Sequence, residues 1–226
     1  MEGQEDGEPM SECQTARDKP ADLIGKVEVP VGASGAWAIQ QFTVSDDDAK
    51  QEWFRAQVQA LQGRRYVPVP AGDYTRLIRD GIIVMSDTPS EMADHAAPVR
   101  RATGRVFIAG LGLGMVLQAV LDKPEVEHAT VLELSEDVYK LVAPHYLWRY
   151  GPERLTIVKG DVMTWTPPKG THRNPYDVAW FDIWDTKSGD NLDEFTRIKR
   201  RWSRWAKWRG FWAEDIIRYS VRRGCL

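Results

Sequence analysis

The second half of the chain alternates between short apolar runs and longer segments with the spacing of helices. The apolar runs, which are rich in Val and Ile, predict strands at 106–109, 130–134, 155–158 and 176–183. The segments between and after these runs predict helices at 115–121, 136–147 and 192–208. Strands that alternate with helices in this way indicate a parallel sheet with crossover helices.

A short apolar segment at 210–213 predicts one more strand. The five strands of this half, numbered in chain order, would then lie in the order 3-2-1-4-5, which is that of a Rossmann-type sheet. We therefore expect an α/β fold with a Rossmann-like parallel sheet and helices on both of its faces.

The first half has a different pattern, in which short strands and turn signals dominate. Strands are predicted at 36–44 and 66–69, and a hairpin at 74–85 turns near Asp80-Gly81. Ser45 and the three Asp residues after it predict the start of a helix that carries Trp53, Phe54, Val58 and Leu61. This pattern predicts a small β-rich extension ahead of the parallel sheet.

Composition limits the class of protein. The 226 residues are 42% hydrophobic, which is enough for one core and excludes wholesale disorder. The net charge of −3 excludes a global basic field, and no apolar stretch reaches the ~20 residues of a membrane span. The chain contains only Cys13 and Cys225, which excludes a disulfide framework and a zinc cluster. We therefore expect a protein of the reducing cytoplasm, with no membrane partner.

Charge is distributed unevenly along the chain. Residues 1–20 contain six acids and two bases, whereas residues 197–223 contain ten bases and two acids. We expect a disordered acidic tail at 1–21, an N-terminal β/α extension at 22–103 and a Rossmann-like domain at 104–226.

A glycine-rich loop between a predicted strand and a predicted helix carries the strongest chemical signal. Its sequence, Gly110-Leu111-Gly112-Leu113-Gly114, allows the backbone to approach a ligand closely. Glu133 lies 23 residues after Gly110, near the ~20 residues at which an acid binds ribose hydroxyls. The alternative is a structural turn with a solvated Glu.

Further acids follow the next two predicted strands. Asp161 follows the third strand, and Asp182 and Asp185 follow the fourth. Ligands of open α/β sheets bind outside the carboxyl ends of the strands, so Glu133, Asp161 and Asp182 should face one crevice with the glycine loop. Each acid alone could be a helix cap or a solvated loop residue, but together they indicate a ligand site.

These residues resemble the motifs of class I S-adenosylmethionine-dependent methyltransferases. The resemblance rests on the glycine loop, Val131-Leu132-Glu133, Gly160-Asp161 and Tyr176-Asp177-Val178 with Phe181-Asp182. Within that superfamily the chain is similar to the spermidine-synthase branch. This finer similarity rests on Asp80-Gly81-Ile82-Ile83, Glu91-Met92-Ala93-Asp94-His95 and Asp182-Ile183-Trp184-Asp185.

The resemblance implies S-adenosylmethionine, or its decarboxylated form, as the cofactor. We expect no metal, and the minor alternative is a metal-assisted transfer with Asp182 as an oxygen ligand for Mg²⁺. It implies that Gly110, Gly112 and Gly114 border the methionine part of that ligand. Glu133 would bind the ribose, and Asp161 would reach the adenine amino group.

The reacting group of a small-molecule substrate would lie at the end of the fourth strand. Asp182 would orient or deprotonate an amine or hydroxyl, and Asp185 would add negative potential that favours a cation. Glu91 and His95 are candidate cofactor-binding residues. The alternative for them is a capping box between Thr88 and Glu91, with His95 paired to Glu91 one turn later.

The chain also departs from the spermidine-synthase branch. That branch has a Gln after the hairpin and a Tyr-His pair before the Glu-Met, where this chain has Val84 and Pro89-Ser90. We therefore expect a methyltransferase that acts on a small amine or hydroxyl compound. The alternatives are aminopropyl transfer from decarboxylated S-adenosylmethionine, and a non-catalytic Rossmann-like module that binds nucleic acid or a protein partner.

The helix predicted at 192–208 combines an apolar stripe with a basic face. The stripe consists of Leu192, Phe195, Ile198, Trp202, Trp205 and Trp208. Such spacing indicates a helix packed on the sheet, and the alternative is an exposed platform that stacks on bases. We expect burial, with weak nucleic-acid contact through the basic face. A second copy of the chain is a further candidate partner.

Overall fold

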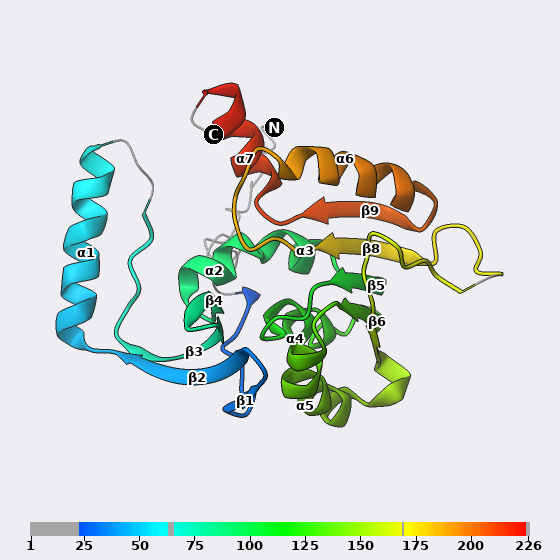
Figure 1. The fold of residues 1–226 in the computed structure, drawn as a ribbon, viewed down its shortest axis with the longest axis horizontal. Helices are drawn as coiled ribbons and strands as arrows, with labels where there is room; N and C mark the ends of the chain where they lie inside the picture. The colour runs from blue at the N-terminus through cyan, green and yellow to red at the C-terminus, as the bar shows by residue number, and fades with distance from the viewer. Residues whose placement is uncertain (1–22, 63–65, 169, 225–226) are drawn as a thin grey trace, which may run out of the picture.

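A computed structural model describes residues 23–62, 66–168 and 170–224, which form two sheets and the helices around them (Figure 1). The predicted acidic tail at 1–21 lies outside the described residues, as do Cys13 and Cys225.

The larger sheet is parallel throughout and has five strands. They are β5 (Gly104–Ala109), β6 (Val126–Glu133), β7 (Leu155–Lys159), β8 (Tyr176–Phe181) and β9 (Ala206–Phe211). Their order is β7-β6-β5-β8-β9, which is 3-2-1-4-5 in chain order. The predicted Rossmann-like α/β fold is therefore confirmed.

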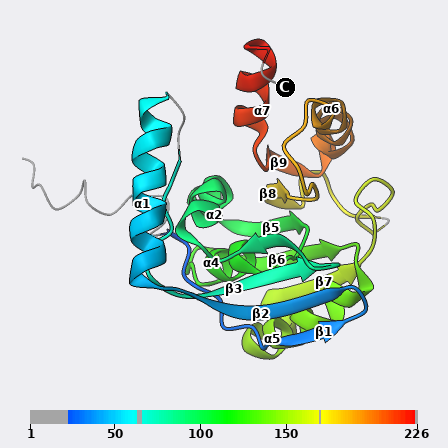
Figure 2. The same ribbon diagram turned by 60° about the vertical axis from the view of Figure 1, so that its left-hand side comes forward.

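Helices pack on both faces of the parallel sheet, and each face has its own core (Figure 2). On one face lie α3 (Ala96–Arg101), α4 (Met115–Leu121) and α5 (Glu136–Arg154, interrupted at Gly151). On the other face lie α6 (Asn191–Arg201) and α7 (Glu214–Arg222). The β5 side chains alternate between the two cores, as the pleat of a strand requires.

The helix predicted at 192–208 is shorter in the structure. Instead of continuing to residue 208, α6 ends at Arg201, and Trp202–Arg204 form one 3-10 turn, η2. The next strand, β9, then begins four residues earlier than the predicted 210, because Ala206 and Trp208 pair with β8. Strand pairing therefore prevails over the helical spacing of the aromatic residues.

Trp202 faces the core beneath α6, as the apolar stripe predicted, and it is 0% exposed. Trp205 and Trp208 are partly buried. Trp208 lies on β9 and stacks against Trp180 in the core of the opposite face.

The smaller sheet is antiparallel and lies in the N-terminal part. It consists of β1 (Gly32–Ser34), β2 (Trp37–Val44), β3 (Gly72–Arg79) and β4 (Ile82–Ser86), in that order. The predicted hairpin turns at Asp80 and Gly81, which both have positive φ. The predicted strand at 66–69 does not form, because Pro68 and Pro70 have no backbone N–H to donate.

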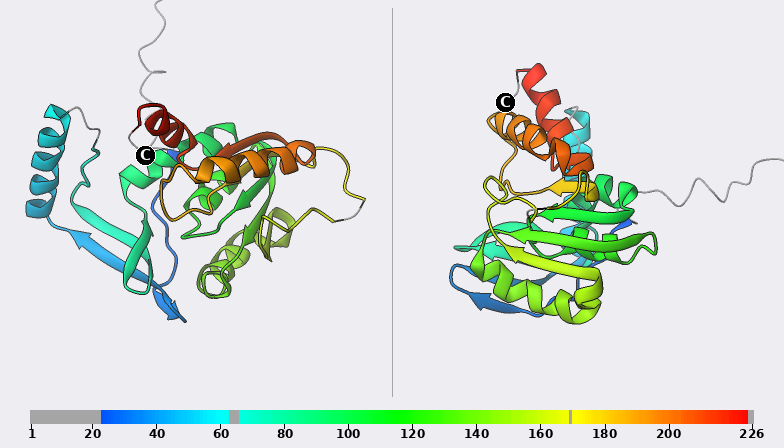
Figure 3. Two further views of the ribbon diagram at one scale, coloured as in Figure 1. Left: turned by 45° about the horizontal axis from the view of Figure 1, so that its top comes forward. Right: turned by 90° about the vertical axis from the view of Figure 1, so that its right-hand side faces the viewer.

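Helix α1 (Asp46–Leu61) stands away from both sheets in Figure 1 and in the left view of Figure 3. The Ser45 side chain accepts the Asp48 N–H, so the predicted cap is confirmed. Trp53 and Phe54 are nevertheless 59% and 67% exposed, and Ala56 is the only buried residue of this helix. The apolar positions of α1 therefore do not belong to either core.

Candidate functional site

The carboxyl ends of the parallel strands surround a cavity of about 790 Å³. Gly110 and Gly112 follow β5, Glu133 ends β6, Asp161 follows β7, and Asp182 follows β8. All five residues line this cavity. The structure also brings Glu91, His95 and Asp185 to the same cavity.

The glycine loop is pressed against the end of β8. Gly110 has a φ of +95°, and a Cβ at this position would lie 2.0 Å from the backbone oxygen of Asp182. Only glycine fits here, because the backbone oxygen cannot move away as a flexible side chain can. Gly114 is different, since a Cβ there would meet the Tyr146 ring at 2.1 Å. The structure thus places Gly114 against α5 rather than on the cavity lining.

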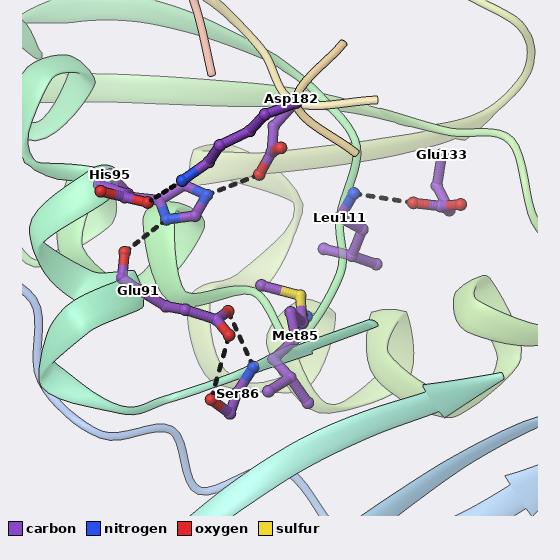
Figure 4. A network of polar contacts seen from close by, with 10 residues as sticks. Met85, Ser86, Glu91, His95, Leu111, Glu133 and Asp182 are labelled. Carbon is purple, nitrogen blue, oxygen red and sulfur yellow. Dashed lines mark hydrogen bonds and ion pairs between the residues drawn. The ribbon is translucent and has the colours of Figure 1, made fainter. Parts of the chain in front are cut away.

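Glu133 is buried, and each of its carboxylate oxygens accepts one backbone N–H. Oε2 accepts from Leu111 at 2.7 Å (Figure 4). Oε1 accepts from Ser135 at 2.7 Å. Burial raises the pKa of Glu133, and these N–H donors act in the opposite direction. Each carboxylate oxygen has a further lone pair, so Glu133 can still accept hydrogen bonds from a ligand.

His95 and Asp182 form a partly buried ion pair, although they are 87 residues apart in the sequence. His95 is 3% exposed, and its Nε2 lies 2.7 Å from Asp182 Oδ2 (Figure 4). Its Nδ1 lies 2.7 Å from the Glu91 carbonyl oxygen, which can only accept, so Nδ1 carries a proton. Burial lowers the pKa of His95, but Asp182 and the Glu91 carbonyl raise it more, to about 9. His95 is therefore a cation at neutral pH.

The Glu91 side chain does not form the capping box considered for it. Its carboxylate accepts the Ser86 N–H at 2.9 Å and the Ser86 hydroxyl at 3.2 Å. Thr88 is the N-cap residue of α2 (Pro89–Asp94), but its side chain makes no capping hydrogen bond. Instead, the Thr88 hydroxyl lies 3.1 Å from the Ser86 hydroxyl. Burial raises the pKa of Glu91, which lines the cavity beside His95.

Asp161 and Asp185 have different surroundings. Asp161 Oδ1 accepts the Met163 N–H at 2.8 Å, which fixes the turn after β7. Asp185 is half exposed and forms an ion pair of 2.5 Å with Arg79 of β3. A second ion pair, of 3.0 Å, joins Lys187 to Asp94 of α2. Together with the pair of His95 and Asp182, three ion pairs therefore connect the segment between β8 and α6 to the N-terminal part.

Acidic side chains outnumber basic ones on the cavity lining. Its seven acids are Glu91, Asp94, Glu133, Asp161, Asp182, Asp185 and Glu194. Its three basic residues are Arg79, His95 and Lys187, which leaves an excess of four acids. Such a lining favours a cation over an anion.

Sequence reasoning missed Met85, Arg79 and Lys187 as cavity residues. Met85 lies beside the glycine loop (Figure 4). Its sulfur is 3.3 Å from the Leu113 nitrogen. No sequence motif marks these positions, because their contacts depend on how the N-terminal part packs against the parallel sheet and the segment after β8.

The described residues contain neither a cluster of metal ligands nor a helix that could span a membrane. No three His, Cys, Asp or Glu side chains among them are grouped so that they could hold a metal ion. No helix within the described part is both long and apolar enough to cross a bilayer.

The ion pair of His95 and Asp182 predicts that the fold loses stability at alkaline pH. The folded pKa of His95, about 9, lies above its ordinary value of 6.5, so the pair stabilises the fold fully below pH 6.5. This contribution, on the order of 3 kcal/mol, is lost as the pH rises through 9. We expect the free energy of unfolding from urea titrations to fall between pH 7 and pH 10. The decrease should be much smaller in a His95→Gln protein, and an equal decrease would contradict the assignment.

Comparison with protein-family models and with curated proteins gave no match. Several solved structures are similar in fold. The [4+2]-cyclase SpnF is 20% identical, with a TM-score of 0.40 over 52% of this chain and 42% of that one. A putative S-adenosylmethionine-dependent methyltransferase from Methanococcus maripaludis is 16% identical, with a TM-score of 0.38 over 57% and 59%. A putative sarcosine dimethylglycine methyltransferase from Galdieria sulphuraria is 20% identical, with a TM-score of 0.34 over 52% and 39%.

In each case the aligned region spans less than two thirds of the solved chain. The identities are below 25% and the TM-scores below 0.5, so the similarity extends to part of the fold only.

Proposed function

We propose that this protein is an S-adenosylmethionine-dependent transferase, and that it methylates a small amine or hydroxyl compound. The observation that carries the proposal is the single cavity formed by the glycine loop, Glu133, Asp161 and Asp182 at four successive strand ends. In an open α/β sheet this edge is where nucleotide-like ligands bind.

The residues around the cavity fit an adenosyl ligand with a positive sulfonium centre. Glu133 offers a buried carboxylate to the ribose hydroxyls, and Asp161 offers a partly buried carboxylate to the adenine amino group. Gly110 and Gly112 allow the ligand to approach the backbone closely. The excess of acids on the lining suits the positive charge. When bound, S-adenosylmethionine supplies an electrophilic methyl group, so the protein's task is to position and deprotonate the acceptor.

We assign Asp182 as the base that takes the proton from the methyl acceptor. His95 binds Oδ2 of this carboxylate and holds its orientation, so we assign Oδ1 to an N–H or O–H of the substrate. Asp185 is paired with Arg79, so we assign it to positioning the segment after β8 rather than to proton transfer. The acidic lining favours an amine over a neutral alcohol.

Aminopropyl transfer from decarboxylated S-adenosylmethionine would use the same residues. Decarboxylated S-adenosylmethionine lacks the carboxylate of S-adenosylmethionine. An acidic lining repels that carboxylate. Calorimetry with both forms distinguishes the two activities, because the enzyme should bind its own cosubstrate more tightly.

The nucleic-acid module is the weaker alternative. Arg197, Arg200 and Arg204 are exposed at the C-terminal end of α6 and in η2, where they could contact phosphates. Base stacking has less support, because Trp202 is buried and the Arg204 guanidinium lies 4.6 Å from the centre of the Trp205 ring.

Replacing Glu133 with Ala tests the cofactor assignment. The change removes two hydrogen bonds to a charged acceptor, each worth about 1.5–3 kcal/mol, so S-adenosylmethionine should bind at least about tenfold more weakly in calorimetry. Glu127→Ala is the matched control, because Glu127 is an exposed residue of the same strand and does not line the cavity. Equal affinities in the two folded variants would refute the proposed function.

A further inference from the structure

Met85 reaches the glycine loop because strand β4 is irregular. Leu77 of β3 pairs with Met85, but the next residue, Ile78, pairs with Ile83, so Val84 is an extra residue in β4. Such a bulge changes the direction of the side chains around it, and bulges often lie beside binding sites. Ile83 is exposed, whereas Met85 is partly buried and lines the cavity.

The Met85 side chain covers the backbone of the loop. The Leu113 N–H points at the Met85 sulfur, with a nitrogen–sulfur distance of 3.3 Å. A Cβ at Gly112 would lie 2.3 Å from the same sulfur. Gly112 therefore makes room for Met85, and Met85 occupies the space that the glycine opens toward the cavity.

This contact is weak and easily exchanged. A thioether sulfur is a poor hydrogen-bond acceptor, and a methionine side chain has three rotatable bonds. A ligand carboxylate would accept the same N–H much more strongly, because the hydrogen bond is then charge-assisted. A ligand carboxylate that reaches the Leu113 N–H should therefore replace the Met85 sulfur as its acceptor.

We propose that Met85 is a displaceable plug that selects among adenosyl ligands by the group attached to their sulfur. The inference rests on the proposed function, in which the glycine loop borders the amino-acid end of S-adenosylmethionine. A ligand that has the amino-acid end must displace the Met85 side chain from Leu113 and Gly112 before it can bind completely. A ligand without it leaves Met85 where it is.

Two probes separate this role from the adenosyl site itself. S-adenosylhomocysteine carries the amino-acid end, and 5′-methylthioadenosine carries a methyl group in its place. In Met85→Ala, calorimetry should show S-adenosylhomocysteine binding about fivefold or more tightly than in the natural protein. The affinity for 5′-methylthioadenosine should stay within about twofold. Ile83→Ala, on the same strand and away from the cavity, should change neither affinity.

A second measurement uses the natural protein and does not depend on how well the variant folds. With carbon-13 in the methionine methyl groups, the Met85 resonance, assigned through Met85→Leu, should shift on addition of S-adenosylhomocysteine. It should keep its position with 5′-methylthioadenosine.

Three results would overturn the inference. The first is that Met85→Ala changes the two affinities equally. The second is that it weakens the binding of S-adenosylhomocysteine more than that of 5′-methylthioadenosine. The third is that the Met85 resonance shifts equally with both ligands. If neither ligand binds the natural protein, the proposed function itself fails. If both bind and their ratio is unaffected by Met85→Ala, the role of Met85 alone is refuted.

Discussion

Replacing Asp182 with Asn is expected to lower kcat by about 10² to 10⁴, the range typical for loss of a general base. Asn keeps the shape of the side chain, but it cannot take a proton from an acceptor amine. The affinity for S-adenosylmethionine should change by no more than a few-fold, because Glu133 and the glycine loop are left intact. The measurement is transfer of labelled methyl from S-adenosylmethionine to a panel of small amines and alcohols.

Asp185→Asn is the matched control for this change. Asp185 lies three residues further along and is paired with Arg79, so its variant should lose less than about tenfold in kcat. The Asp182→Asn protein also loses the anion that pairs with His95, so its folding must be verified at the pH of the assay. Normal turnover by a folded Asp182→Asn protein would exclude the role of Asp182 as a base.

Replacing Trp202 with Ala is expected to cost about 3–5 kcal/mol of unfolding free energy. The side chain is fully buried. The centroid of its ring lies 4.2 Å from that of Phe107 and 5.2 Å from that of Phe181. Ala would leave a cavity among these rings that the surrounding strands cannot fill. The loss is comparable to the whole stability of a marginal domain, about 5 kcal/mol, and chemical denaturation measures it directly.

Trp148→Ala is the control for the size of the residue removed. Trp148 is 86% exposed on α5, so its loss should change the free energy of unfolding by less than about 0.5 kcal/mol. A small effect for both variants would mean that Trp202 is not packed as described and would favour a stacking surface.

The parallel half of the fold could be predicted from the sequence because its signals are local. Each strand is a short apolar run, and helix α4 spans the predicted residues 115–121. The C-terminal end was less predictable, since apolar residues at helical spacing continue past Arg201 to Trp208. Only the pairing of Ala206 with Tyr176, thirty residues away, determines that this segment becomes a strand.

The candidate site likewise combines residues that local signals predict with contacts that depend on long-range packing. Glu133, Asp161 and Asp182 could be placed together because parallel strands end at one edge of the sheet. The contacts of His95 with Asp182, of Arg79 with Asp185 and of Met85 with the glycine loop could not. They join the N-terminal part to the carboxyl ends of the parallel strands, and no periodicity in the sequence encodes how these two parts pack together.

Helix α1 has a consequence for how the molecule opens. A segment that buries little apolar surface exchanges its backbone amides through a local fluctuation, without global unfolding. With Ala56 as its only buried residue, α1 depends mainly on its own hydrogen bonds and on the Ser45 cap, and a lone helix of this length is marginal in water. We therefore expect hydrogen exchange to place the amides of α1 and those of β5 in separate cooperative units, so that one two-state free energy describes the sheet but not this helix.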